Sequence, residues 1–314
     1  MGLDDDPRGS VSTPGASTAP VFLIGAPRSG TTLLYKCLAL SPSFSYISNY
    51  NERLPRWELT ALLNRIPARL PELRRKVWFG GAGGNAYVYN EGRPLVHKLL
   101  PMPTEGESIF TRVGLPEASV PPDAPTAEEA AALARTFEQL RRRGGGRRLL
   151  NKRIANNLRI PFLAETFPDA SFVVLTRDGR AVANSLRKVN WWPDLWVFWY
   201  GSTTRQWEAS GGDPWELAGR HWVEEVSAIE RGVVDLPVGR VLRLSYEDFA
   251  TDPVGHLAQL SAELGVPPRP DWLAEIDRLS YPTTTDGWRS TLTGDALATV
   301  ERVQRDTLRR YGYA

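Results

Sequence analysis

The strongest constraint on the fold lies near the start of the chain, where an apolar run, a glycine-bounded loop and a second apolar run follow one another. Residues 20–24 read Pro-Val-Phe-Leu-Ile, which is typical of a buried strand. Residues 25–30 begin and end with glycine and predict a loop, and residues 31–38 predict a helix that ends before residue 41. A strand, a glycine loop and a helix in this order open many α/β nucleotide-binding domains.

Strand and helix patterns alternate along the rest of the chain. Strands are predicted at 148–151, 171–176 and 239–244. Helices are predicted at 57–78, interrupted by Pro67 and Pro71, and at 194–235, broken near Gly211 and Gly212. Further helices are predicted at 126–143, 156–167, 178–188, from 252 onward and at 295–310. The proline-rich stretch 101–125 is predicted to be a loop. This alternation indicates an α/β fold of the P-loop type, with a mostly parallel sheet flanked by helices on both faces. We expect residues 1–19 to be a disordered leader and residues 20–314 to form a single domain.

Composition and charge exclude several classes of protein. The 38 Lys and Arg residues nearly balance 36 Asp and Glu, so the surface is not polycationic and nucleic acid is not an expected partner. The single cysteine excludes an intramolecular disulfide and a cysteine-rich zinc site. No apolar run approaches the roughly 20 residues of a membrane helix, and no signal pattern opens the sequence. We therefore expect a cytoplasmic protein without integral membrane association.

The first loop has the spacing of a Walker A phosphate loop with one departure. Two glycines are separated by four residues and Thr32 takes the Ser/Thr position, but Thr31 stands where the lysine belongs. Backbone N–H groups at the helix start still suit a phosphate, and Arg28 adds a charge. The candidate phosphate-binding residues are Arg28, Ser29, Gly30, Thr31 and Thr32.

A second strand, loop and helix carries another pair of candidates. Arg177 ends the strand at 171–176, and Ser185 follows eight residues later. If Asp178 caps the following helix, Ser185 lies about two turns inside it. A guanidinium and a hydroxyl at this edge of the sheet are able to converge on one phosphate.

These segments resemble the sulfotransferases that use 3′-phosphoadenosine-5′-phosphosulfate (PAPS). Residues 25–34 are similar to the family's 5′-phosphosulfate loop, and residues 172–185 to its 3′-phosphate segment, including the Arg-to-Ser spacing of eight. Tyr246 lies in a segment that resembles the strand end near the adenine, and Trp288 and Arg289 stand where the family has a late basic segment near the 3′-phosphate.

The resemblance runs from about residue 20 to residue 292 and implies the reaction. It implies PAPS as the donor, no metal ion, and a hydroxyl-bearing acceptor, which is a small molecule or is linked to a lipid. The form Pro-Arg-Ser-Gly-Thr-Thr at 27–32 is closer to the bacterial and tyrosylprotein branch than to the cytosolic steroid and phenol enzymes.

The same resemblance suggests the catalytic groups. Lys152 matches the Asn-Lys element of the tyrosylprotein branch, whose lysine assists the leaving group. Ile154 stands where cytosolic members carry a catalytic histidine, so that base is absent. Glu52 is the first candidate base, because the tyrosylprotein branch uses a glutamate shortly after the first helix, and His97 is the second.

Aromatic residues point to the acceptor. Seven of the eleven tryptophans lie between residues 191 and 222, just after the segment with Ser185. They line a site for a hydrophobic, aromatic or glycosylated acceptor, or they pack helices onto the sheet, or they form a lipid-facing surface.

Two other functions stay open on the sequence. A P-loop kinase of small molecules is the first, although the lysine that a kinase loop uses is missing. A non-catalytic nucleotide-binding protein is the second, although it would have no need of Lys152 and Arg177 together.

Overall fold

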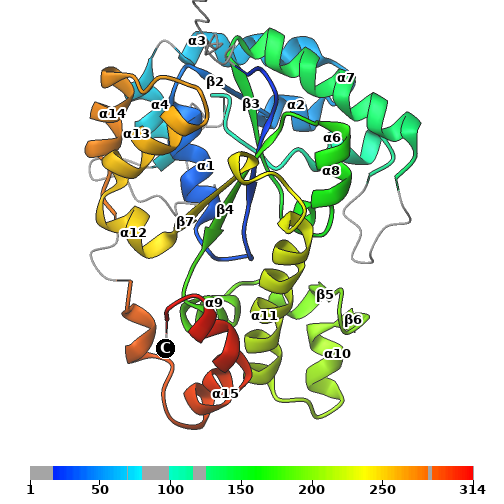
Figure 1. Cartoon of the computed structure of the whole chain (residues 1–314), viewed down its shortest axis with the longest axis vertical. Coiled ribbons are helices and arrows are strands. Elements are labelled where there is room, and N and C mark those ends of the chain that lie inside the picture. Colours follow the sequence, from blue (N-terminus) through cyan, green and yellow to red (C-terminus); the bar gives the residue numbers. More distant parts are fainter. Residues whose placement is uncertain (1–16, 69, 80–98, 116–124, 282–284, 314) are drawn as a thin grey trace, which may run out of the picture.

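The computed structural model describes residues 17–68, 70–79, 99–115, 125–281 and 285–313 (Figure 1). Most of the predicted leader, residues 1–16, therefore lies outside the described residues. Five strands form one sheet in the order β2 (Phe44–Tyr46), β3 (Arg148–Lys152), β1 (Val21–Ile24), β4 (Ser171–Thr176) and β7 (Val241–Ser245). All four pairings are parallel, which confirms the predicted sheet.

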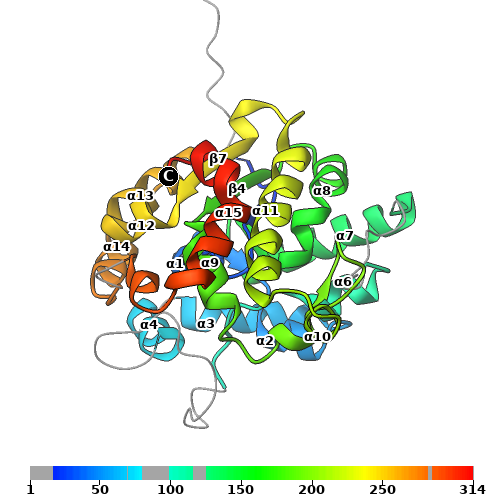
Figure 2. The same cartoon turned by 90° about the horizontal axis from the view of Figure 1, so that it is seen from below.

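Helices cover both faces of this sheet (Figures 1 and 2). Leu23 and Val173 point to one face, while their neighbours Phe22 and Phe172 point to the other, because successive strand residues alternate. The first face packs against α1 (Thr31–Leu40), α4 (Pro71–Phe79), α12 (Tyr246–Thr251), α13 (Pro253–Glu263) and α14 (Pro270–Asp277). The second face packs against α6 (Glu107–Arg112), α7 (Ala127–Gly144), α8 (Ile160–Thr166) and the end of α11 (Pro214–Val233).

A third core cluster lies beyond the carboxyl ends of the strands, at the bottom of Figure 1. It is built from α9 (Gly179–Leu186), α15 (Gly294–Arg310) and the first part of α11. Beside it lie α10 (Thr204–Ala209) and a hairpin of β5 (Trp196–Val197) and β6 (Ser202–Thr203). The short helices are α2 (Asn49–Arg53), α3 (Arg65–Ala68), η1 (Glu58–Asn64), η2 (Ile154–Leu158), η3 (Trp192–Asp194), η4 (Val238–Arg240) and η5 (Gly287–Ser290).

Two expectations from the sequence were wrong in detail, and one strand was missed. The stretch 194–235 does not begin as a helix, because Gly201 turns the chain at φ +71° and makes the β5–β6 hairpin. The predicted loop 101–125 contains α6. The three-residue strand β2 was not predicted, since its apolar pattern is too short to distinguish and its pairing with β3 creates it.

None of the helices in the described ranges has the length and apolar character that a membrane crossing requires.

Candidate donor and transfer site

The predicted phosphate loop lies at the point in the sheet where the chain connections run to opposite sides. The chain leaves β1 toward β2 on one side of it, and leaves β4, the neighbour of β1 on the other side, toward β7. The loops after β1 and β4 therefore diverge at the carboxyl ends of two adjacent strands. In open α/β sheets ligands bind in this crevice.

The loop itself is shaped for an anion. Its turn closes through the Ser29 amide, which donates to the Ala26 carbonyl at 3.1 Å. Gly30 takes a left-handed conformation and immediately precedes α1, whose first turn has no side-chain cap and no acidic residue. The buried Ser29 hydroxyl has no hydrogen-bond partner within the described part of the chain. The amides at the helix start, the helix dipole and this hydroxyl all favour a bound anion.

Gly30 is required for two separate reasons. Its φ of +94° is one that side-chain-bearing residues rarely adopt, and a Cβ there would lie 2.5 Å from Cδ2 of Tyr246. The ring of Tyr246 thus lies against the loop, and its place beside the adenine stays a prediction.

We expect Gly30→Ala to destabilise the fold by about 3 kcal/mol or more, because strain and a clash add together. Gly211→Ala is the matched control: Gly211 has φ +86°, and a Cβ there would meet no other atom of the described chain within 4 Å. Gly211→Ala should lower the free energy of unfolding only by the cost of the left-handed backbone conformation, about 1–2 kcal/mol. Chemical denaturation measures both, and equal losses would contradict a contact between Gly30 and Tyr246.

Arg28 connects Arg177 and Ser185 in the structure. Arg28 Nε donates to Ser185 Oγ at 2.9 Å, and Arg177 Nη1 donates to the Arg28 carbonyl at 3.1 Å. The Arg177 guanidinium lies 4.2 Å from the centre of the Tyr246 ring, and its buried Nε has no hydrogen-bond partner among the described residues. Asp178 caps α9 through the Arg180 amide, which fixes the helix that carries Ser185.

The late basic segment packs against the same helix. Thr291, just after η5, accepts from Asn184 Nδ2 at 2.9 Å and from Lys188 Nζ at 3.3 Å. Trp288 is buried in the third core cluster, whereas Arg289 is exposed and lies 3.5 Å from Asp286. The segment is thus beside Ser185, with the Arg289 charge turned toward solvent.

Lys152 stands at the end of β3, paired with Leu23 of β1, so it is next to the strand that leads into the phosphate loop. Only 5% of Lys152 is exposed, and its ammonium forms an ion pair with Glu105. Glu105 was not anticipated, because it lies in the proline-rich stretch that we predicted to be a loop.

Glu52 has fixed partners in the structure. One carboxylate oxygen accepts from the Ser108 amide at 2.8 Å and the other from the Thr104 hydroxyl at 3.2 Å. The Glu52 carbonyl also accepts from the Ser108 hydroxyl at 2.6 Å. The other candidate base, His97, lies outside the described residues.

A row of buried polar side chains contacts the first residue of the phosphate loop, and no pattern in the sequence predicts it. The Asn157 amide group binds both backbone groups of Gly25, accepting from its N–H at 3.3 Å and donating to its carbonyl at 3.0 Å. The same Asn157 Nδ2 donates to Glu225 at 2.7 Å. His221 follows, with its Nε2 3.7 Å from Glu225.

Burial changes both ionisable groups of this row in ways that prevent an ion pair. It raises the pKa of Glu225 to about 7, partly opposed by the Asn157 hydrogen bond, and lowers the pKa of His221 to about 4. Since histidine loses its proton before Glu225 does as pH rises, a charged pair is never the main form.

This shift in pKa predicts a pH dependence of stability. Between about pH 4.5 and pH 7 the unfolded chain releases the Glu225 proton while the folded protein keeps it, so the free energy of unfolding falls as pH rises. Glu225→Gln removes this loss. Its free energy of unfolding should therefore rise relative to that of the wild type across this pH range, by on the order of 3 kcal/mol at the plateau above pH 7. The lowered pKa of His221 reduces the free energy of unfolding as pH falls below about 6.5, but this effect is present in both wild type and Glu225→Gln. Urea unfolding at several pH values tests this, and a difference that does not change with pH would contradict it.

The tryptophan-rich stretch serves mainly for packing. Trp192 and Trp222 are buried in the third core cluster, and Trp199 and Trp207 pack edge to face 6.1 Å apart. Trp191 and Trp196 are the more exposed ones, at 45% and 37%. Most of the band is therefore core, and the acceptor role remains a prediction for its exposed members.

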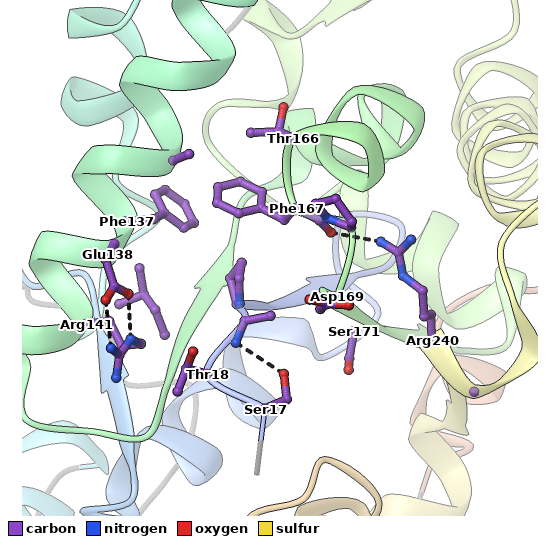
Figure 3. Close-up of a pocket in the computed structure, with 16 residues that line it drawn as sticks. Ser17, Thr18, Phe137, Glu138, Arg141, Thr166, Phe167, Asp169, Ser171 and Arg240 are labelled. Carbon is purple, nitrogen blue, oxygen red and sulfur yellow. Dashed lines mark hydrogen bonds and ion pairs between the residues drawn. The ribbon is translucent and has the colours of Figure 1, made fainter. Parts of the chain in front are cut away.

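A cavity of about 780 Å³ lies at the amino-terminal ends of the strands, away from the phosphate loop (Figure 3). Its lining includes Ser17, Phe137, Phe167, Ser171 and Arg240. Ser171 begins β4, whereas Arg177 follows its end, so this cavity is separate from the phosphate loop. Arg240 donates to the Ala170 carbonyl at 2.9 Å, which explains its place there.

No group of three or more His, Cys, Asp or Glu within the described ranges is placed to hold a metal ion.

The parallel sheet and the glycine loop between β1 and α1 define a fold of the P-loop type, in which Thr31 stands at the position of the Walker lysine. The model of the sulfotransferase family matches residues 20–271, most of the chain, so the protein belongs to the sulfotransferase family. It is accordingly a PAPS-dependent enzyme of sulfuryl transfer.

Solved structures match the chain at low sequence identity. Sulfotransferase STF9 from Mycobacterium avium supports the fold: it is 17% identical with a TM-score of 0.52, and the match covers 94% of this chain and 77% of that one. The sulfotransferase domain from the curacin biosynthetic pathway is also 17% identical, with a TM-score of 0.48 and coverage of 93% and 98%. Retinol dehydratase in complex with retinol and PAP is 15% identical, with a TM-score of 0.40 and coverage of 94% and 82%. No protein with a curated description matches the chain.

Proposed function

We propose that this enzyme transfers the sulfuryl group of PAPS to a hydroxyl of a small or lipid-linked acceptor, with the donor held between the first loop and α9. The convergence of Arg28, Arg177 and Ser185 beside the loop carries the proposal. Arg28 lies 149 positions from Arg177 and 157 positions from Ser185 in the sequence, yet the three meet at the crevice where α/β sheets bind ligands.

The residues present fit the two charged ends of the donor. Ser29, Gly30, Thr31 and Thr32 offer amides and hydroxyls at the start of α1 for the 5′-phosphosulfate, and the Ser29 hydroxyl, which is buried without a partner among the described residues, supports this. Arg28, Arg177 and Ser185 suit the 3′-phosphate, and the equally unpartnered Arg177 Nε supports that. Tyr246 is proposed to lie beside the adenine, and Trp288 and Arg289 to close the 3′-phosphate end.

Lys152 is proposed to assist the leaving group. The bound donor supplies an activated sulfuryl group, and negative charge develops on the phosphate as that group departs. An ammonium beside the loop neutralises this charge best in the transition state. Its position opposite Leu23 in the sheet supports the role.

The acceptor is proposed to be hydrophobic, aromatic or glycosylated. The exposed members of the tryptophan-rich stretch support this: Trp191 after α9 is 45% exposed and Trp196 is 37% exposed. A cytoplasmic location stays a prediction from the sequence.

Binding and turnover together test the proposed function. Thermal shift should show much stronger stabilisation by adenosine 3′,5′-bisphosphate (PAP) than by AMP or by ATP with magnesium, because only PAP carries the 3′-phosphate. Turnover should be measured with radiolabelled PAPS and three acceptors: 2-naphthol, 4-nitrophenol and 1-decanol. Equal stabilisation by PAP and AMP would overturn the donor site, and ATP-dependent, chelator-sensitive transfer would favour a kinase.

A further inference from the structure

The carboxylate nearest the proposed leaving-group lysine belongs to Glu105. Its Oε1 pairs with Lys152 Nζ, and its Oε2 lies 3.4 Å from the Ile154 amide. Its side chain is 46% exposed, whereas that of Lys152 is 6% exposed. An acceptor arriving from solvent therefore meets the carboxylate before it meets the ammonium.

The backbone of Glu105 is held on both sides. The Thr104 amide donates to the Ile47 carbonyl at 2.8 Å, and Asn151 Nδ2 donates to the Glu105 carbonyl at 3.0 Å. Gly106 follows at φ +80°, where a Cβ would lie 2.7 Å from Ile47 Cδ1. The segment is fixed against β2 and β3, so the carboxylate is preorganised at the carboxyl edge of the sheet.

Glu52 accounts for part of this rigidity. Its two carboxylate oxygens bind Thr104 and Ser108, the residues on either side of the Glu105–Glu107 turn. A carboxylate engaged in this way holds the turn in place, and the ammonium of Lys152 pairs with Glu105 instead.

We propose that Glu105 is the general base that takes the acceptor proton, and that Glu52 is a positioning residue that holds the turn carrying it. This assignment rests on the proposed function and moves the base away from Glu52, where the resemblance put it.

The step balances with the groups named. Glu105 takes the proton of the acceptor O–H as the acceptor oxygen forms its bond to sulfur. The bond from sulfur to the phosphate oxygen breaks, and that oxygen keeps the electron pair. Lys152 neutralises the new charge on PAP, and protonated Glu105 returns its proton to water. The Lys152 ammonium thus exchanges its ion pair with the Glu105 carboxylate for one with the phosphate, and this leaves the carboxylate available to take the proton.

The test compares three glutamates of one region. Glu105→Gln should lower kcat with 2-naphthol and 1-decanol by about 10²–10⁴-fold, and by much less with 4-nitrophenol, which gives up its proton readily. Its affinity for PAP, measured by calorimetry without any acceptor, should be unchanged or tighter, because a negative charge beside Lys152 is removed. Glu52→Gln should lose less than about 10-fold in kcat, since an amide oxygen still accepts from Ser108.

Two further variants separate chemistry from structure. Added formate should restore part of the activity of Glu105→Ala, because the site is exposed enough for a small carboxylate to enter. Formate should not affect Glu52→Ala. Glu107→Gln is the matched control: its carboxylate pairs with Arg153 at 2.6 Å, so it should lose thermal stability while keeping its turnover.

The outcomes are distinct. Full activity in Glu105→Gln, or a parallel loss of PAP binding and turnover, would overturn the assignment of Glu105. A large loss in Glu52→Gln with the same dependence on acceptor acidity would return the base to Glu52. If wild type binds PAP no better than AMP and transfers sulfate to none of the three acceptors, the proposed function itself fails.

Discussion

Replacing Lys152 with alanine is expected to lower kcat by about 10²–10³-fold while leaving the affinity for PAP within a few-fold of wild type. The reason is that the ammonium acts mainly on charge that develops as the sulfuryl group leaves, so its loss appears in the transition state rather than in binding. Single-turnover kinetics with PAPS and PAP calorimetry on the same variant measure the two quantities.

Lys152→Met serves as a second variant, because it keeps the buried stem and removes only the charge. Lys76→Ala is the control for a lysine with an ion pair outside the site, since Lys76 pairs with Glu72 on the exposed side of α4. A loss of PAP affinity as large as the loss of kcat would make Lys152 a donor-binding residue instead.

Replacing Arg177 with alanine is the second large effect that we expect. It should remove most of the preference for PAP over AMP, a loss of about 10- to 100-fold in the ratio of the two affinities, corresponding to about 1.5–3 kcal/mol. The ratio is the informative quantity, because Arg177 also holds the Arg28 carbonyl and stacks on Tyr246, and those contacts serve both nucleotides.

Arg177→Lys tests the geometry separately. A lysine keeps the charge but not the planar fork, so we expect an intermediate ratio. Arg205→Ala is the control, because Arg205 forms an exposed pair with Asp194. An unchanged ratio in Arg177→Ala would show that the 3′-phosphate binds elsewhere.

Much of the donor site is readable from the sequence, since its parts are local. The loop from Gly25 to Thr32 lies between a strand and a helix in one continuous segment, and so does the pair Arg177 and Ser185. In each case the strand end, the turn and the helix start fix where the side chains lie. That both segments reach the same crevice follows from parallel strands, whose carboxyl ends share one edge.

The parts that sequence reasoning missed depend on packing between distant segments. Strand β2 exists through its pairing with β3, and the β5–β6 hairpin interrupts what looked like a helix. The support of Gly25 by Asn157 and Glu225 joins three elements, and no single one of them carries a pattern that predicts it.

The class of fold follows from the amino-acid sequence, because strand and helix patterns alternate along it. The phosphate loop without its lysine and the spacing of Arg177 and Ser185 follow as well, because each lies within one short run of residues. Which carboxylate accompanies Lys152 depends instead on how distant segments pack. The sequence pointed to Glu52, which follows the first helix, and gave no reason to consider Glu105 in its proline-rich stretch. The difference arises from the register of β2 and β3, which sets the Thr104–Ser108 turn against Glu52 and directs Glu105 to Lys152.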